Sequence, residues 1–203
     1  VSWASENSLM VNAADWANDL SYLSNLPAHG TFFPLMQQQL VQTPLDSCNV
    51  HTVCFVMSDG DNIQWILNSL AVDSDWWASP DRGSVPITWT MSPALVDLAP
   101  SVLSYFYRNA SNNEQTGGSD YFIAAPSGTG YVYPDDYADI SGFAEVTNQY
   151  MAATDMTILN VIADDAPDSS DSTPFTQQSN IDGIFWYLYS NYAGLNGKGL
   201  LGL

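Results

Sequence analysis

The chain has 203 residues, of which 46% are hydrophobic and 13% aromatic, and its formal net charge is -19. This composition supplies enough apolar material for one sizeable core and argues against intrinsic disorder. With 3 Lys and Arg residues against 22 acidic ones, the surface is a poor partner for nucleic acid. No run approaches the roughly 18 apolar residues that a membrane-spanning helix needs.

The first 50 residues are predicted to form a helical lead-in. Within Ala13–Leu26, the side chains of Trp16, Leu20 and Leu23 recur at helical spacing, and Pro27 ends the run. Because the chain begins at Val1 rather than at Met, we expect a mature product or part of a longer chain.

From residue 51 onward, apolar strand-like runs alternate with amphipathic helices, which is typical of a parallel α/β fold. The predicted strands are Thr52–Met57, Pro86–Met91, Tyr121–Ala125, Thr157–Ala163 and Gly183–Tyr189. The predicted helices are Asp61–Leu70, Pro93–Tyr107 and Tyr137–Ala153, with a short helical turn at Phe175–Ser179. The loops between them include Asn109–Ser119 and Asp164–Thr173.

This order predicts a single α/β domain over residues 1–203, with a TIM-barrel-like sheet or an open doubly wound sheet. A complete barrel has eight strands. The five predicted here indicate a barrel that is incomplete.

Acidic residues follow several of these strands, where ligands bind in both architectures. Asp59 and Asp61 follow the first strand, Asp164 and Asp165 follow the fourth, and Asp135 lies in the loop after the third. Because parallel strands end at the same edge of a sheet, these side chains are expected to share one rim. They are the candidate catalytic residues, apart from Asp135, which is a candidate for substrate binding.

Paired carboxylates on one rim favour glycoside hydrolysis. Glycosidases need two carboxyl groups about 5 to 5.5 Å or about 6.5 to 9.5 Å apart. Asp59 or Asp61 facing Asp164 or Asp165 could meet either spacing. Two alternatives stay open, since Asp59 and Asp61 could also bind calcium, and either of them could instead cap the next helix.

Aromatic residues near the same rim are candidates for sugar stacking. Residues 128–134 read Gly-Thr-Gly-Tyr-Val-Tyr-Pro, in which the glycines permit a tight turn and the two Tyr side chains alternate in direction. The candidate substrate-binding residues are therefore Asn62, Trp65, Tyr131, Tyr133 and Asp135. Trp76, Trp77 and Trp89 could contribute too, although core packing is the commoner role for a Trp.

Residues 128–134 match, residue for residue, the signature of the GxGYxYP family of glycoside hydrolases. Residues 58–65 also resemble the acidic segment of that family, and the resemblance extends from about Ala13 to Gly199. It implies a TIM-like α/β catalytic domain that acts on carbohydrate, with Asp59, Asp61, Asn62 and the Gly, Tyr and Pro residues of the signature at matched positions. Such proteins are longer than this chain, with a preceding N-terminal domain.

Export from the cell is expected from the scarcity of Lys and from the sequon at Asn109, a candidate glycosylation site. Cys48 and Cys54 could form a disulfide only if the chain turns between them; otherwise Cys54 is a buried free thiol. Neither His29 nor His51 lies in a recognisable catalytic or metal-binding pattern.

Two functions remain open on the sequence. The first is an extracellular carbohydrate-active enzyme, a glycosidase that uses Asp carboxylates at strand ends and needs no resident cofactor. The second is a non-catalytic extracellular structural or glycan-binding module that assembles with copies of itself in a coat or fibre. The apolar tail Gly199–Leu203 is a candidate docking segment for such assembly.

Overall fold

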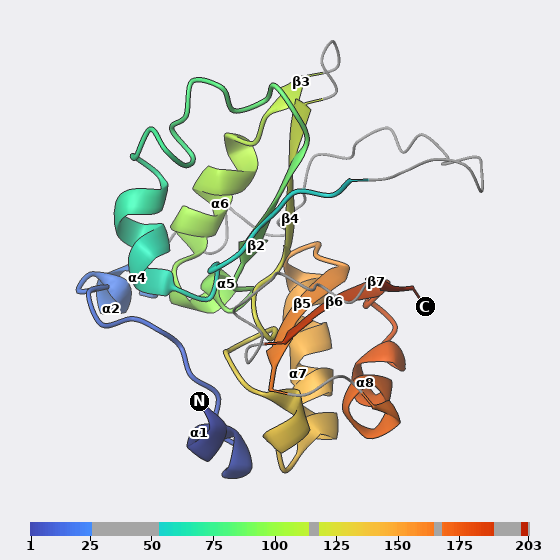
Figure 1. Ribbon diagram of the computed structural model, residues 1–203. Coiled ribbons are helices and arrows are strands. Elements are labelled where there is room, and N and C mark those ends of the chain that lie inside the picture. Colours follow the sequence, from blue (N-terminus) through green and yellow to red (C-terminus); the bar gives the residue numbers. More distant parts are fainter. Residues whose placement is uncertain (26–52, 114–117, 165–167, 189–199, 203) are drawn as a thin grey trace, which may run out of the picture.

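The computed structural model describes residues 1–25, 53–113, 118–164, 168–188 and 200–202 (Figure 1). Its sheet is built from β1 (Val56–Met57), β2 (Ile87–Met91), β3 (Asn112–Asn113), β4 (Gly118–Ala124), β5 (Ile158–Ala163), β6 (Gly183–Leu188) and β7 (Leu200–Gly202). The strand order is β1-β2-β4-β5-β6-β7, and β3 pairs with β4.

Five of these strands, β1, β2, β4, β5 and β6, run parallel to their neighbours, whereas β3 and β7 are antiparallel. The parallel strands form a curled half-barrel sheet with alternating helices, so the predicted incomplete TIM-barrel-like fold is confirmed. Their carboxyl ends consequently lie along one edge of the sheet.

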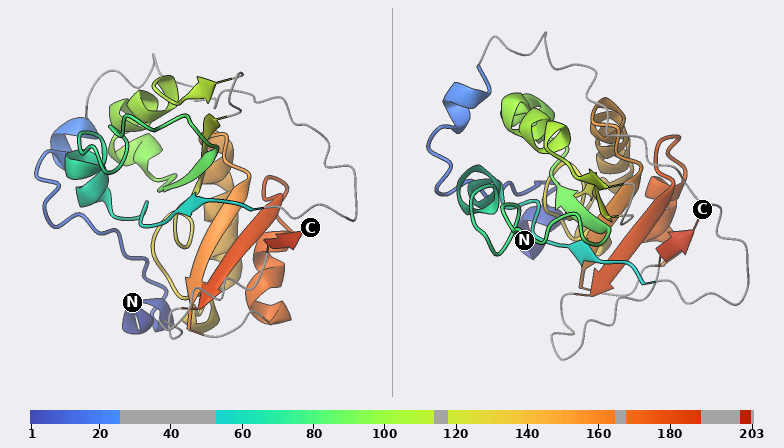
Figure 2. Two further views of the ribbon diagram at one scale, coloured as in Figure 1. Left: turned by 45° about the horizontal axis from the view of Figure 1, so that its top comes forward. Right: turned by 90° about the horizontal axis from the view of Figure 1, so that it is seen from above.

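The helices are short except in the centre of the chain. They are α1 (Ser2–Glu6), α2 (Leu20–Leu23), α4 (Ile63–Trp65), the π-helical turn η1 (Ile66–Leu70), α5 (Leu95–Leu98), α6 (Pro100–Arg108), the 3-10 turn η2 (Pro134–Asp136), α7 (Ile140–Ala153) and α8 (Ser169–Thr176). In Figure 2, α6 and α7 lie along the same side of the curled sheet. None of the helices in the described ranges is long and apolar enough to cross a membrane.

The core lies between this side of the sheet and the helices. Alternate strand residues such as Met91, Ala124, Leu159 and Ile184 are fully buried there. Phe106 of α6 is equally buried. Because side chains alternate between the two faces of a strand, the residues between these core positions face the inside of the curl.

Within the described part of the predicted lead-in, α1 and α2 are the helical segments. Only Leu20–Leu23 of the expected helix is helical, and Trp16 is 73% exposed instead of facing a core. The first strand is also shorter than predicted, since it begins at Val56, and Val53 and Phe55 before it are exposed. Apolar periodicity alone did not reveal that Trp16, Val53 and Phe55 are exposed, whereas Leu20 and Leu23 pack against the core.

Two other predicted boundaries differ for local reasons. The helix expected over 93–107 is divided into α5 and α6, because Ala99 leaves the helical conformation before Pro100. The loop expected over 164–173 instead contains the start of α8. There Asp168 and Asp171 form a capping box, in which the side chain of each residue accepts a hydrogen bond from the backbone N–H of the other.

The described residues of the tail belong to the sheet, and its docking role stays a prediction. Residues 200–202 form β7, which pairs antiparallel with β6 and therefore extends the sheet. Cys54 is a free, exposed thiol, so it is neither bridged nor buried. Cys48, His29, His51 and Asp165 lie outside the described residues.

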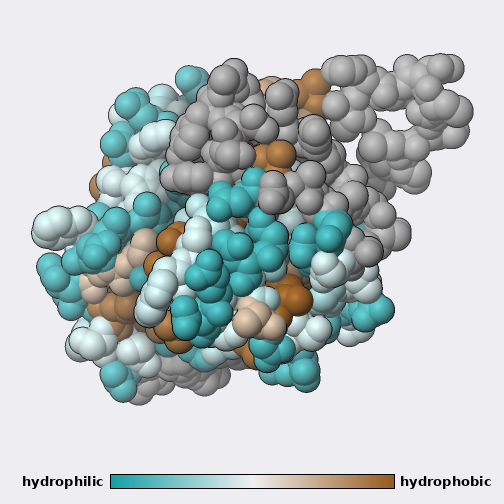
Figure 3. All heavy atoms as spheres, turned by 60° about the horizontal axis from the view of Figure 1, so that its bottom comes forward, coloured by the Kyte–Doolittle hydropathy of each residue, from teal (hydrophilic) through white to brown (hydrophobic). Residues whose placement is uncertain are grey.

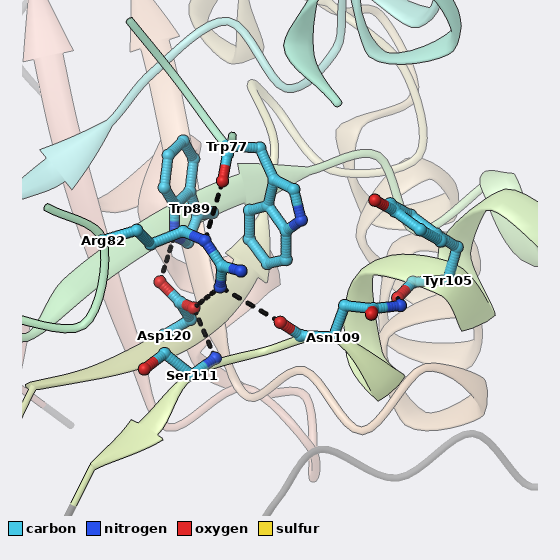
Figure 4. A network of polar contacts seen from close by, with 7 residues as sticks. All are labelled: Trp77, Arg82, Trp89, Tyr105, Asn109, Ser111 and Asp120. Atoms are coloured by element: carbon cyan, nitrogen blue, oxygen red, sulfur yellow. Dashed lines mark hydrogen bonds and ion pairs between the residues drawn. The ribbon is translucent and has the colours of Figure 1, made fainter. Parts of the chain in front are cut away.

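A buried ion pair lies at the amino-terminal ends of β2 and β4, away from the edge where the parallel strands end (Figure 4). Arg82 donates to the Asp120 carboxylate at 2.5 Å and lies over the Trp77 ring at 4.1 Å. Asp120 also accepts from the indole N–H of Trp89 at 2.8 Å and from the backbone N–H of Ser111 at 2.6 Å. The pair is thus fully integrated into the packing between two strands and the loop after α6.

Candidate functional site

The loop after β1 places two carboxylates at the carboxyl-terminal edge of the sheet. Asp59 has a φ of +69°, in the left-handed region that Asp tolerates better than most residues. Asp61 lies two residues later and is more deeply buried than Asp59. Burial raises the pKa of Asp61 from its ordinary 3.8 to about 6, a hydrogen bond from its own backbone N–H partly opposes this, and the negative charge of Asp59 adds to the rise.

Gly60 fixes this loop against β2. Its N–H donates to the hydroxyl of Thr90 at 2.9 Å, and the same hydroxyl donates to the carbonyl of Met57, also at 2.9 Å. Its carbonyl accepts from the backbone N–H of Ser92 at 2.9 Å. These bonds hold the backbone between Asp59 and Asp61 directly on the neighbouring strand.

Replacing Gly60 with alanine is expected to destabilise the fold by about 1–3 kcal/mol, as overpacking does in other cores. A β-carbon there would overlap the Thr90 carbonyl and lie 2.6 Å from the nitrogen of Met91, and neither is free to move. Chemical denaturation would measure the loss. Gly142→Ala is the matched control, because its β-carbon would meet only the movable Asp139 side chain. A Gly60→Ala protein as stable as this control would contradict the close approach.

The Gly-Tyr-Pro loop after β4 is held by the N-terminal segment. Tyr131 and Val11 exchange two backbone hydrogen bonds, at 2.8 and 3.1 Å. The N–H of Tyr133 donates to the hydroxyl of Ser5 at 3.0 Å. A side chain at Gly130 would collide with Met10, so the absence of a β-carbon there permits this docking. The signature therefore has a structural role in this fold.

The same N-terminal segment also reaches the acidic loop. Ala13 forms a bridge with Asn62, and its carbonyl accepts from the N–H of Gln64 at 3.2 Å. Val11 and Ala13 are two residues apart, so the loop after β1 and the loop after β4 are neighbours. The structure thus brings Asp61 and Asn62 into the vicinity of Tyr131.

The predicted aromatic residues differ in how far they reach the surface. Tyr131 is half-buried, whereas Tyr133 is 6% exposed, and their rings meet edge to face with centroids 5.6 Å apart. Trp65 is half-buried and contacts Trp76 edge to face. Trp77 and Trp89, considered as extra candidates, are core residues, as expected for the commoner role of Trp.

Other predicted residues are placed along the same edge by the topology. Asp135 lies in η2, directly after the signature, and its charge contributes to raising the pKa of Asp171, after burial and the charge of Asp168. Asp164 follows β5 directly. Within the described ranges, no group of three or more His, Cys, Asp or Glu side chains is arranged to hold a metal ion.

Three residues that the structure places at or beside this region were not among the predicted site residues. Trp16, whose backbone N–H donates to the Gln64 side chain at 3.3 Å, is a highly exposed ring near the acidic loop. Ser92 and Asn160 are buried polar residues on the inside of the curl. A signal for Asn160 existed, because it is the one polar residue in the apolar run of β5.

Seen from the side of α1 and α7, the described surface is mostly hydrophilic, with separate smaller hydrophobic patches (Figure 3). This is the side on which the loop after β4 and the N-terminal segment meet.

Comparison with known proteins identifies the family. Residues 49–201 match the model of the GxGYxYP putative glycoside hydrolase C-terminal domain. A crystal structure of a putative hydrolase from Bacteroides thetaiotaomicron VPI-5482 superimposes with a TM-score of 0.80 at 32% sequence identity, over 93% of this chain and 35% of that one. No curated protein matches the chain. The chain thus spans about a third of that hydrolase, and it belongs to the GxGYxYP putative glycoside hydrolase family through its C-terminal domain.

Proposed function

We propose that this protein hydrolyses O-glycosidic bonds with carboxylates from the loop after β1. The observation that carries the proposal is the pair formed by Asp61, with a pKa of about 6, and Asp59, whose negative charge contributes to that rise. Two neighbouring carboxyl groups in different environments can divide the roles of acid and base. Membership of a family described as glycoside hydrolases supports the same reaction.

In this mechanism Asp61 is the general acid. Its proton passes to the glycosidic oxygen as the bond from that oxygen to the anomeric carbon breaks, so the leaving sugar departs as a neutral alcohol. Asp59, which is more exposed, either attacks the anomeric carbon directly, forming a glycosyl ester that water then hydrolyses, or takes a proton from the water molecule that attacks that carbon. The retaining and inverting mechanisms share this division of roles.

Asp59 is a better partner for Asp61 than Asp164. The strand that carries Asp164 is separated from β1 by β2 and β4. Three strand spacings amount to roughly 14 Å along the sheet, which exceeds the separations of about 5 to 9.5 Å in glycosidases. The curl of the sheet shortens this path, and Asp164 remains the second candidate.

Aromatic and polar groups around the pair suit a sugar ligand. The half-exposed ring of Tyr131 and the exposed ring of Trp16 offer faces on which apolar sugar surfaces stack. Trp65 and Asn62 belong to the helix that follows the acidic loop. An extracellular location fits the strong negative charge and the exposed position of Asn109 at the end of α6.

Hydrolysis by the full-length protein should fall as the pH rises through about 6, because Asp61 must be protonated to act as an acid. Release of nitrophenol from a panel of 4-nitrophenyl glycosides, measured between pH 4 and 8, tests this. A rate that rises through this range would contradict the role of Asp61. Retention on glycan without hydrolysis would instead favour the binding module.

A further inference from the structure

A row of residues crosses the inside of the curled sheet beside the acidic loop. Met91, Ala124, Leu159 and Ile184 are register partners on β2, β4, β5 and β6, and all four face the core. The residue after each of them therefore faces the opposite way, towards the inside of the curl. These following residues are Ser92, Ala125, Asn160 and Phe185, which we call the inner row.

The inner row begins at the proposed catalytic loop. Ser92 donates its backbone N–H to the carbonyl of Gly60, the residue between the two carboxylates. Ala125 lies between Ser92 and Asn160, and it contributes only a methyl group. The inner row therefore runs from the backbone of the acidic loop to Asn160. Between its two polar residues, Ser92 and Asn160, it has only the small side chain of Ala125.

The polar atoms of this row have no hydrogen-bond partner within the described chain. They are the hydroxyl of Ser92 and both the oxygen and the nitrogen of the Asn160 amide, and these two residues are 1% and 0% exposed. The side-chain oxygen of Asn62, next to Asp61, is also buried and unpaired. Proteins pair most buried polar groups, since an unpaired one opposes folding.

Other buried polar side chains of the same sheet are paired. The hydroxyl of Thr90 bonds to Met57 and Gly60, and that of Ser127 bonds to Val132. The unpaired side-chain atoms of the inner row thus differ from these neighbouring hydroxyl groups, which are hydrogen-bonded. Such exceptions occur where a residue is kept for binding rather than for stability.

We propose that Ser92 and Asn160 form the floor of the carbohydrate site and hydrogen-bond hydroxyl groups of the sugar. An amide can donate to one hydroxyl and accept from its neighbour, which suits the adjacent hydroxyls of a pyranose. The atoms are enclosed in this structure, so their surroundings must shift before a hydroxyl reaches them. This inference rests on the proposed function, and it assigns Ser92 and Asn160 to binding rather than to proton transfer.

The test compares Asn160→Leu with Asn180→Leu in the full-length protein. Leucine has the same number and branching of side-chain heavy atoms as asparagine but no polar atoms, and because its methyl groups are bulkier, the same replacement is made at Asn180. Asn180 is an ordinary paired residue whose amide donates to the carbonyl of Met156 at 2.8 Å. Thermal unfolding is measured for both, and binding of glucose, galactose, mannose, xylose and N-acetylglucosamine is measured by saturation-transfer NMR and titration.

We expect Asn160→Leu to unfold at or above the wild-type temperature and to bind its sugar at least about tenfold more weakly, since about tenfold is the effect of one lost hydrogen bond. Asn180→Leu should unfold at a lower temperature and bind normally. Unchanged affinity in Asn160→Leu, or a loss of stability as large as that of Asn180→Leu, would overturn the assignment. If the wild type binds none of the sugars, the proposed function fails, and the unfolding comparison still decides whether the amide is unpaired.

Discussion

Asp61→Asn is expected to remove hydrolysis while making the protein more stable at neutral pH. Asparagine has the shape of the carboxylic acid but no acidic proton that it can transfer. General acid catalysis contributes about 100- to 10,000-fold to a rate. A fall of that size in kcat is expected even for substrates that bind normally. Loss of activity through unfolding would produce the opposite change in stability.

The stability change follows from the raised pKa of Asp61. The folded pKa is about 6 and the ordinary value is 3.8, so the folded state holds more protons than the unfolded state between about pH 4 and pH 6. Stability therefore falls as the pH rises through this window, by about 3 kcal/mol for a shift of about two units. An asparagine at this position does not titrate and has no such dependence, so the variant gains relative to the wild type above pH 6.

Denaturation curves at pH 4 and pH 7, together with the pH profile of hydrolysis, measure both effects. Asp59→Asn is the matched control, because asparagine also tolerates the left-handed backbone at that position. It removes one source of the raised pKa of Asp61, so any residual activity should fall off at a lower pH than in the wild type. An Asp61→Asn protein that is less stable than the wild type at pH 7 would show that the ionised carboxylate is stabilised by partners.

Asp120→Asn is expected to destabilise the fold by about 3–5 kcal/mol, the usual cost of removing one member of a buried ion pair. The side chain of Asp120 is 2% exposed and that of Arg82 is 21% exposed. Water would therefore solvate the charge of Arg82 poorly once its partner carboxylate is removed. The amide would also lose one of the acceptor oxygens that now serve Arg82, Trp89 and Ser111. The ion pair lies far from the proposed site, so catalysis in the folded fraction should be unchanged.

Chemical denaturation at one pH measures this loss. Asp97→Asn is the control, because it removes the same charge from an exposed hydrogen bond to Tyr150, for which a change below about 1 kcal/mol is expected. A double variant that replaces Arg82 with Met and Asp120 with Leu should be more stable than Asp120→Asn, since no buried charge remains. Equal losses in Asp120→Asn and Asp97→Asn would show that the ion pair is unimportant.

The strands of the sheet could be predicted from the sequence because each is an apolar run bounded by turn residues. The runs that form β2, β4, β5 and β6 can be located to within a few residues for this reason. Contacts made by distant segments could not be predicted. The partner of Arg82 is 38 residues away, and β7 consists of a few residues with no pattern of their own.

The candidate site was predictable only as far as strand ends could be recognised. Asp59 and Asp61 follow β1 at the edge where the parallel strands end, whereas Tyr131 is held near them by the N-terminal segment. The close approach of Gly60 to Thr90 across the sheet, next to Asp61, was not predictable from the strand pattern. The position of Trp16 was missed as well, because its periodicity with Leu20 and Leu23 resembled a helix.

The docking of residues 11–13 between two loops has a mechanical consequence. The backbone bonds of Val11 to Tyr131 and of Ala13 to Gln64 belong to one stretch of three residues, which is too short and too extended to absorb a relative displacement. The acidic loop after β1 and the Gly-Tyr-Pro loop after β4 are thus hydrogen-bonded to the same short segment. Motion of either one is communicated to the other through peptide bonds rather than through side-chain packing.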